Sequence, residues 1–226
     1  MKTPRQKKTA RRYYTFTINN AAEVKTFARY QDVPAHNRPQ RRKRLERWVI
    51  SRFLVTANHR RRLHFPIRIR HAFVNQAPDF LVTVRGGVLE GYEVTQATTR
   101  KYQVKLERNE KRPMGKSILF GDLAGSRGYA AETYWCRGIL KAVRAKLSKL
   151  NKGHYETAAR QNLLIYDDME AFGVDHREAL RRLKRPLATA LSACARAFDS
   201  ISIVTTQNTL LLDVSKGTSI ITIPLL

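Results

Sequence analysis

Residues 78–98 read PDFLVTVRGGVLEGYEVTQAT. An apolar, β-branched run occupies residues 80–84, Arg-Gly-Gly interrupts it at 85–87, and a second apolar run follows at 88–94. A glycine pair between two such runs is typical of a tight turn that joins antiparallel strands. The pattern therefore predicts a β-hairpin, and the other predicted elements are arranged around it.

Two carboxylates flank this hairpin, Asp79 where the first strand begins and Glu93 near the end of the second. Both lie at a similar distance from the turn, so we expect them opposite each other with Cβ atoms about 5 Å apart. Carboxylates that close repel each other unless a cation lies between them, and hard divalent cations prefer oxygen ligands. The spacing predicts a metal site. The alternative is a surface hairpin in which Asp79 caps a turn and Glu93 faces solvent.

The order of these residues, Pro78-Asp79, a hairpin and the triplet Glu-Val-Thr at 93–95, resembles the PD-(D/E)XK (restriction endonuclease-like) nuclease superfamily. In that family a Pro-Asp pair opens one strand and an acid-x-Lys triplet lies on the next. The two acids hold Mg²⁺, and the lysine positions the attacking water. The resemblance implies that Asp79 and Glu93 hold Mg²⁺ or Mn²⁺.

Thr95 stands where the resembled motif has its lysine. We therefore expect Thr95 or Gln96 at the water-orienting position, or a lysine supplied from another part of the chain. The missing lysine favours the alternative, in which a protein with the same fold has no catalytic activity.

Residues 128–152 have the clearest helical pattern, with an apolar face and a glycine, Gly153, where the helix should end. Glu132 and Lys146 interrupt the apolar face. Glu132 is a candidate third acid, and Lys146 is a candidate for the displaced lysine. The alternative for each residue is a structural role, as part of a buried salt bridge or through a helix-end effect. They lie about 21 Å apart along the helix axis, so both cannot serve one metal site.

The composition points to a folded protein with a polyanionic partner. The chain has 226 residues, 42% hydrophobic residues, a net charge of +25 and a pI near 10.8. That hydrophobic content is enough for a core, which argues against disorder. Nucleic acid is the usual partner of so basic a protein, and an anionic membrane surface is the lesser alternative.

Basic residues concentrate in two blocks near the start of the chain. Residues 1–12 form a basic arm, and residues 38–63 form a second basic block. The core of this block, residues 41–54, predicts a helix with an apolar face on the sheet and an arginine-rich face in solvent, and residues 60–62 extend the positive charge beyond its end. Glu46 interrupts the basic block; it is either an acid of the kind that related nucleases often carry on this helix or a salt-bridge partner. The residues expected to bind phosphates are Arg11, Arg12, Arg41, Arg42, Lys43, Arg44, Arg47, Arg60, Arg61 and Arg62.

Several other classes of protein lack support in the sequence. The two cysteines are far apart and favour reduced, buried thiols over a metal pair. The sequence has no run long enough for a membrane helix, no secretory signal, no P-loop and no Cys-His zinc spacing. We expect a cytoplasmic protein that does not contact membranes.

The remaining pattern completes an α/β (α+β) fold with a mixed central β-sheet flanked by helices. Strands are expected at 13–18, 65–74 and 162–168, and helices at 98–111 and 176–197, the last kinked or broken by Pro186. Asp167 and Asp168 are expected to cap a turn. The segment 201–226 predicts a C-terminal β-meander. The predicted division is a basic N-terminal extension, 1–37, and a nuclease-like domain, 38–226, with a restriction endonuclease-like core.

These observations lead to one preferred function and two alternatives. We expect a metal-dependent nuclease that hydrolyses phosphodiester bonds, with DNA as the substrate and an arginine-rich surface that holds the backbone. The first alternative is a nucleic-acid-binding protein without catalysis on a degenerate nuclease fold. The second is an RNA-binding protein of ribosome-like character, which leaves the acidic hairpin unexplained. A homodimer or a larger nucleoprotein complex fits a nuclease that cuts both strands.

Overall fold

The computed structural model describes residues 13–31, 41–72, 78–98, 130–155, 157–167, 174–205, 208–213 and 219–224. The helix expected at 98–111, the arm 1–12 and the connection that leads to residue 129 lie outside this part of the chain, apart from residue 98.

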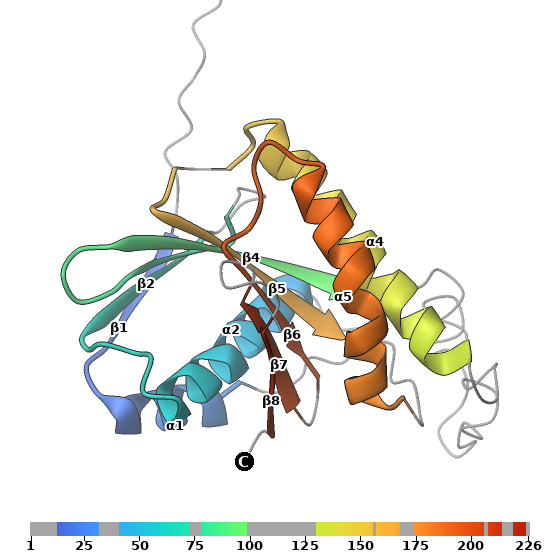
Figure 1. Cartoon of the computed structure of the whole chain (residues 1–226). Coiled ribbons are helices and arrows are strands. Elements are labelled where there is room, and N and C mark those ends of the chain that lie inside the picture. The colour runs from blue at the N-terminus through green and yellow to red at the C-terminus, as the bar shows by residue number, and fades with distance from the viewer. Residues whose placement is uncertain are drawn as a thin grey trace, which may run out of the picture.

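A single mixed β-sheet forms the centre of the molecule, as the sequence predicts (Figure 1). Its eight described strands are neighbours in chain order. The β4–β5 and β5–β6 pairs are parallel, and every other neighbouring pair is antiparallel. The strands are β1 (Tyr13–Ile18), β2 (Ile67–Ala72), β3 (Phe80–Thr83), β4 (Leu89–Ala97), β5 (Arg160–Asp167), β6 (Ser200–Val204), β7 (Asn208–Asp213) and β8 (Ser219–Pro224).

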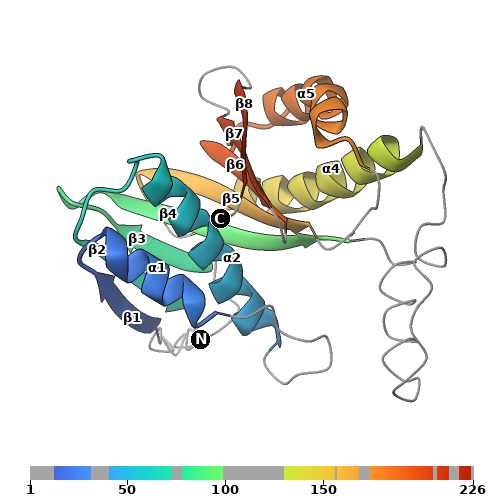
Figure 2. The same cartoon turned by 90° about the horizontal axis from the view of Figure 1, so that it is seen from below.

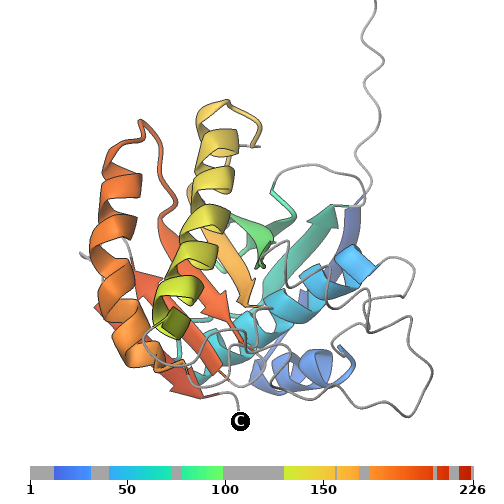
Figure 3. The same ribbon diagram turned by 90° about the vertical axis from the view of Figure 1, so that its right-hand side faces the viewer.

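Helices cover both faces of this sheet (Figures 2 and 3). One buried cluster joins α1 (Ala21–Arg29) and α2 (Arg41–His59) to one face. A second buried cluster joins α4 (Ala130–Asn151) and α5 (His176–Ser192) to the other face. The result is a three-layer arrangement, which agrees with the expected class of a mixed sheet flanked by helices.

The predicted hairpin is present as β3 and β4. Phe80 pairs with Tyr92 and Thr83 with Leu89, and the turn between the strands contains Gly86 and Gly87. These glycines have φ values of 92° and 79°, a conformation that side chains disfavour. The glycine pair therefore sets the register, and the next opposed positions before Phe80 and after Tyr92 are Asp79 and Glu93.

The sequence pattern also predicts α2 and α4 correctly. The apolar face of α2 is buried in the core through Leu45, Trp48, Val49 and Phe53. Helix α4 is followed by Gly153 at φ 72°, the left-handed conformation typical of the residue after a helix end.

Two local expectations are corrected by the structure. Helix α5 is not broken at Pro186, because Leu183 and Leu187 on either side of it are buried in the core and hold the helix on the sheet. The turn expected at Asp167 and Asp168 lies outside the described residues, and the buried Asp167 carboxylate at the end of β5 accepts a 2.6 Å hydrogen bond from Trp135 Nε1. Residues 13–29, expected in the extension, form β1 and α1, and β1 pairs with β2 in the main sheet.

Candidate active site

Asp79 and Glu93 are brought together by the hairpin register, and both are nearly inaccessible to solvent, at 1% and 3% exposure. The backbone N–H of Val94 donates a 2.9 Å hydrogen bond to Asp79 Oδ2, which holds this carboxylate against β4. The carboxylate pair that the sequence predicts is therefore a buried feature at the start of β3, and the exposed-hairpin alternative does not describe it.

Lys146 reaches this pair from α4. Its ammonium group donates a hydrogen bond to Glu93 Oε1, and the lysine itself is buried at 8% exposure. The apolar face of α4 packs on the sheet, so the one lysine on that face points at the acidic residues. The structure thus brings together Asp79, Glu93 and Lys146 in a buried ion pair, which both interpretations of Lys146 allow: a displaced motif lysine or a structural salt bridge.

A third carboxylate, Glu46 of α2, lies on the other side of Asp79. Lys43 Nζ is 2.7 Å from Glu46 Oε2 and 3.8 Å from Asp79 Oδ1, and Arg42 Nε is 3.1 Å from Glu46 Oε1. We call Glu46, Asp79 and Glu93 the acid site. Lys43 was expected in solvent with the other basic residues of α2, but it is half-buried because it turns toward these carboxylates.

His71 supports Glu46 from β2. Its Nε2 is 2.9 Å from Glu46 Oε2, and its ring stacks on Phe80 with a centroid distance of 4.3 Å. Burial lowers the pKa of His71 despite the nearby carboxylate, which favours the neutral ring at pH 7. A carboxylate only accepts, so the neutral ring must carry its proton on Nε2 to make this bond. Burial alone would raise the pKa of Glu46, but the hydrogen bonds from His71 and Lys43 outweigh it and lower that pKa.

Asp79 shows the opposite behaviour. Burial, followed by the charges of Glu93 and Glu46, raises its pKa to about 8. The hydrogen bond from Val94 and the charge of Lys146 act in the other direction but are smaller. Without an additional cation, the acid site therefore favours a protonated Asp79 at neutral pH.

Tyr155 is a member of this site that the sequence analysis did not identify. Its hydroxyl lies beside Glu93; burial, followed by the charges of Glu93 and Asp79, raises its pKa. Tyr155 is 6% exposed, and a side-chain hydrogen bond to Glu93 adds to the rise of its pKa, although the contact falls short of full hydrogen-bond geometry at the hydroxyl and at Glu93 Oε2. No local signal marks Tyr155, because it follows the end of α4 and reaches Glu93 only through the packing of α4 on the sheet.

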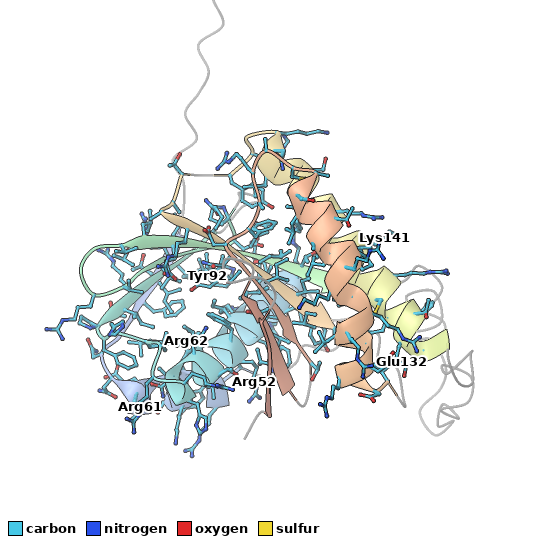
Figure 4. The ribbon with its side chains drawn as sticks, viewed as in Figure 1. Arg52, Arg61, Arg62, Tyr92, Glu132 and Lys141 are labelled. Carbon is cyan, nitrogen blue, oxygen red and sulfur yellow. The ribbon has the colours of Figure 1, made fainter. Side chains whose placement is uncertain are left out.

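The structure places the other candidate residues, Thr95, Gln96 and Glu132, differently relative to Glu93. Thr95 is on the same face of β4 as Glu93, since side chains alternate along a strand. Gln96 is on the opposite face, where Tyr92 and Val94 pack with α2. Glu132 is not a third acid of the site: its carboxylate accepts a hydrogen bond from the backbone N–H of Asp175, and Figure 4 shows it well apart from Tyr92, the neighbour of Glu93.

The acid site fits a hard cation through two ligands. Glu93 Oε2 is a buried anionic oxygen without a partner among the described residues, and Asp79 is opposite it. Within the described ranges, no three His, Cys, Asp or Glu side chains are grouped closely enough to hold one ion. Asp79 and Glu93 together could therefore supply only two protein residues to a hard cation, which typically takes at least six oxygen ligands.

A basic surface adjoins the acid site along α2. Arg42 and Arg44 are exposed and Arg47 is half-exposed, and the exposed residues 60–62 continue the positive charge beyond the helix end (Figure 4). We call these six residues the α2 basic face. Arg42 also lies 4.0 Å from Asp79 Oδ1, so the face begins at the acid site. Arg11, Arg12 and the side chain of Arg41 lie outside the described part of the chain.

Comparison with protein-family models, with curated proteins and with solved structures finds no match to this chain. No helix in the described ranges is both long enough and apolar enough to cross a membrane. The function is therefore inferred from the geometry of the chain's own residues.

Proposed function

We propose that this protein is a metal-dependent nuclease that hydrolyses phosphodiester bonds, with DNA as its substrate. The observation that carries the proposal is the contact of Lys146 with Glu93 beside Asp79. This contact supplies the ammonium group that the hairpin lacks at Thr95, and the acidic residues and the lysine come from separate elements.

Each group has a distinct role in this proposal. Asp79 and Glu93 would hold Mg²⁺ or Mn²⁺, which when bound polarises the scissile phosphate and lowers the pKa of a bound water. Lys146 would orient the attacking water through a hydrogen bond while it remains paired with Glu93. His71 and Lys43 hold Glu46 beside Asp79 and favour its ionised form through their hydrogen bonds. Arg42 and the rest of the α2 basic face would position the flanking phosphates without reading sequence.

The raised pKa of Asp79 supports a cation at this position. Two buried carboxylates that face each other are costly when both are ionised, and a divalent cation removes that cost. The same protein without metal is expected to keep Asp79 protonated at neutral pH, and metal binding should release that proton.

The test is cleavage of plasmid, linear duplex, single-stranded DNA and RNA with Mg²⁺ or Mn²⁺. Wild type is compared with Asp79→Asn and Glu93→Gln, which keep the size of each side chain. Glu132→Gln is the matched control, because this acid is on α4 but away from the site. We expect the control to cut and both site variants to bind substrate without cutting. Cleavage by the site variants at the wild-type rate would refute the proposal.

A second candidate function is nucleic-acid binding without catalysis. The ion pair of Lys146 with Glu93 supports it, because such a pair also neutralises a buried carboxylate in a purely structural role. The two functions differ in their response to metal. A catalytic acid site should give Mg²⁺-dependent thermal stabilisation that Glu93→Gln removes, whereas a scaffold should have the same melting temperature with Mg²⁺ or chelator.

A further inference from the structure

The outer surface of α4 and α5 carries a second group of cations. Four exposed basic residues lie on α4 and four on α5, and they project away from the sheet that the same helices cover. Figure 4 shows Lys141 extending outward from α4. These residues are Arg137, Lys141, Arg144, Lys149, Arg177, Arg181, Lys184 and Arg185.

The spacing of these cations is the same on both helices. Residues 137, 141 and 144 repeat at intervals of four and three, and so do residues 177, 181 and 184. Residues spaced in this way lie on one side of a helix, with neighbouring Cβ atoms about 5–6 Å apart. Helices α4 and α5 pack side by side on one face of the sheet (Figures 1 and 3). The two rows therefore form one extended positive surface.

Acidic residues do little to neutralise this surface. Glu132 and Glu178 are the only acids within α4 and α5. Glu178 pairs with Arg181 and Arg182, and Glu132 accepts a hydrogen bond from the Asp175 backbone. The remaining seven exposed cations make no ion pair within the described part of the chain. We call these seven the α4–α5 basic face: Arg137, Lys141, Arg144, Lys149, Arg177, Lys184 and Arg185.

The α4–α5 basic face and the α2 basic face lie on opposite sides of the sheet. The helix layers and the sheet between them are each about 10 Å thick, so roughly 30 Å of protein separates the two surfaces. One straight nucleic-acid segment cannot contact both, and bending a duplex around the protein has an elastic cost.

We propose that the α4–α5 basic face binds the phosphate backbone of a second nucleic-acid segment, so that one molecule bridges two segments. Repeated cations without base-specific geometry fit a phosphate backbone, which is bound through charge and released counterions. This inference rests on the nucleic-acid partner of the proposed function but not on its cleavage activity.

The test uses a bead-bound duplex that first retains the protein and then captures a fluorescent duplex. EDTA is present throughout, so cleavage does not contribute, and sedimentation at the same concentration confirms a monomer. The test variant is Arg137→Glu/Lys141→Glu/Lys184→Glu. The control is Lys25→Glu/Arg29→Glu/Arg85→Glu, which makes the same charge change at exposed positions on α1 and the hairpin turn.

Wild type and control should capture the second duplex, and the test variant should capture on the order of tenfold less per retained protein molecule. Two results would overturn the bridging proposal and leave the nuclease proposal standing. One is that the test variant captures as much of the second duplex as wild type does. The other is that retained wild type captures no second duplex. An equal loss in the control would overturn it as well, because net charge alone would then explain capture. Capture of phosphatidylserine vesicles in place of the duplex would assign the face to membranes and also overturn it. Failure of wild type to bind the first duplex would overturn both proposals.

Discussion

Lys146 on α4 donates a hydrogen bond to Glu93 Oε1 on β4, although 53 residues separate them in the sequence. Both side chains are buried, so the ammonium group meets the Glu93 carboxylate away from solvent. Thr95, two residues after Glu93, has no positive charge, so the cation of this site comes from packing between elements.

The first prediction concerns Lys146. Lys146→Met keeps most of the side-chain volume but removes the ammonium group, so cleavage should fall by about 10²–10⁴-fold. Duplex affinity in EDTA should change less than about twofold, because the buried lysine is not part of the exposed phosphate-binding surface. Lys25→Met, at an exposed position on α1 outside both basic faces, is the control. Wild-type cleavage by Lys146→Met would show that this lysine has only a structural role.

The second prediction concerns the pH dependence of stability. The ordinary pKa of 3.8 for Asp79 rises to about 8 in the folded protein, so folding favours the protonated form. In EDTA, the stability of wild type relative to Asp79→Asn should therefore be greatest below about pH 4 and should be lost as the pH rises to about 8. The change should be on the order of a few kcal/mol.

Chemical denaturation across this pH range measures the difference. Asp199→Asn is the control, because Asp199 is an exposed residue whose carboxylate also accepts one backbone N–H. Saturating Mg²⁺ at pH 8 should stabilise wild type but not Asp79→Asn. A stability difference between wild type and Asp79→Asn that does not vary with pH would contradict the raised pKa.

The third prediction separates the stability and activity effects of Tyr155. A buried hydroxyl whose hydrogen bond is poorly formed contributes little to stability, so Tyr155→Phe should leave the melting temperature in EDTA unchanged or raise it. If the hydroxyl contacts the substrate or a site water, the same variant should cleave about tenfold more slowly. Tyr30→Phe changes an exposed tyrosine and should alter neither quantity. A Tyr155→Phe protein that is less stable and fully active would exclude this role.

The fourth prediction concerns salt. Arg44→Ala/Arg60→Ala/Arg62→Ala removes three exposed cations from the α2 basic face. If each contacts a phosphate, the slope of log affinity against log salt should become shallower by about 0.9 per contact. Fluorescence anisotropy between about 50 and 200 mM salt measures the slope. Lys25→Ala/Arg29→Ala on α1 is the comparison. The same change in slope per removed cation for both variants would show that the α2 basic face binds phosphates no better than other exposed cations do.

Much of the fold was predictable because it depends on local patterns. The turn glycines predicted the hairpin, and its register followed from their position. Apolar periodicity predicted α2 and α4, since one buried face repeats at helical spacing. Pro186 did not break α5, because the burial of Leu183 and Leu187 in the core offsets the lost hydrogen bond.

The candidate site was only partly predictable. Asp79 and Glu93 are close through a local turn, so the sequence was enough to pair them. Glu132 and Lys146 both broke the apolar face of α4, and the pattern could not distinguish them. The structure separates them because Lys146 lies over Glu93, whereas Glu132 lies at the start of the helix beside α5.

The sequence by itself determined the hairpin with its opposed carboxylates, the main helices and a large positive charge, since each depends on residues that are near one another or on composition. Only the tertiary structure decided that Lys146 and Tyr155 reach Glu93, that Lys43 and His71 hold Glu46, and that cations gather on α4 and α5 as well as on α2. The physical reason is that these groups meet through the packing of separate elements on the two faces of one sheet, and no local spacing encodes which helix covers which strand.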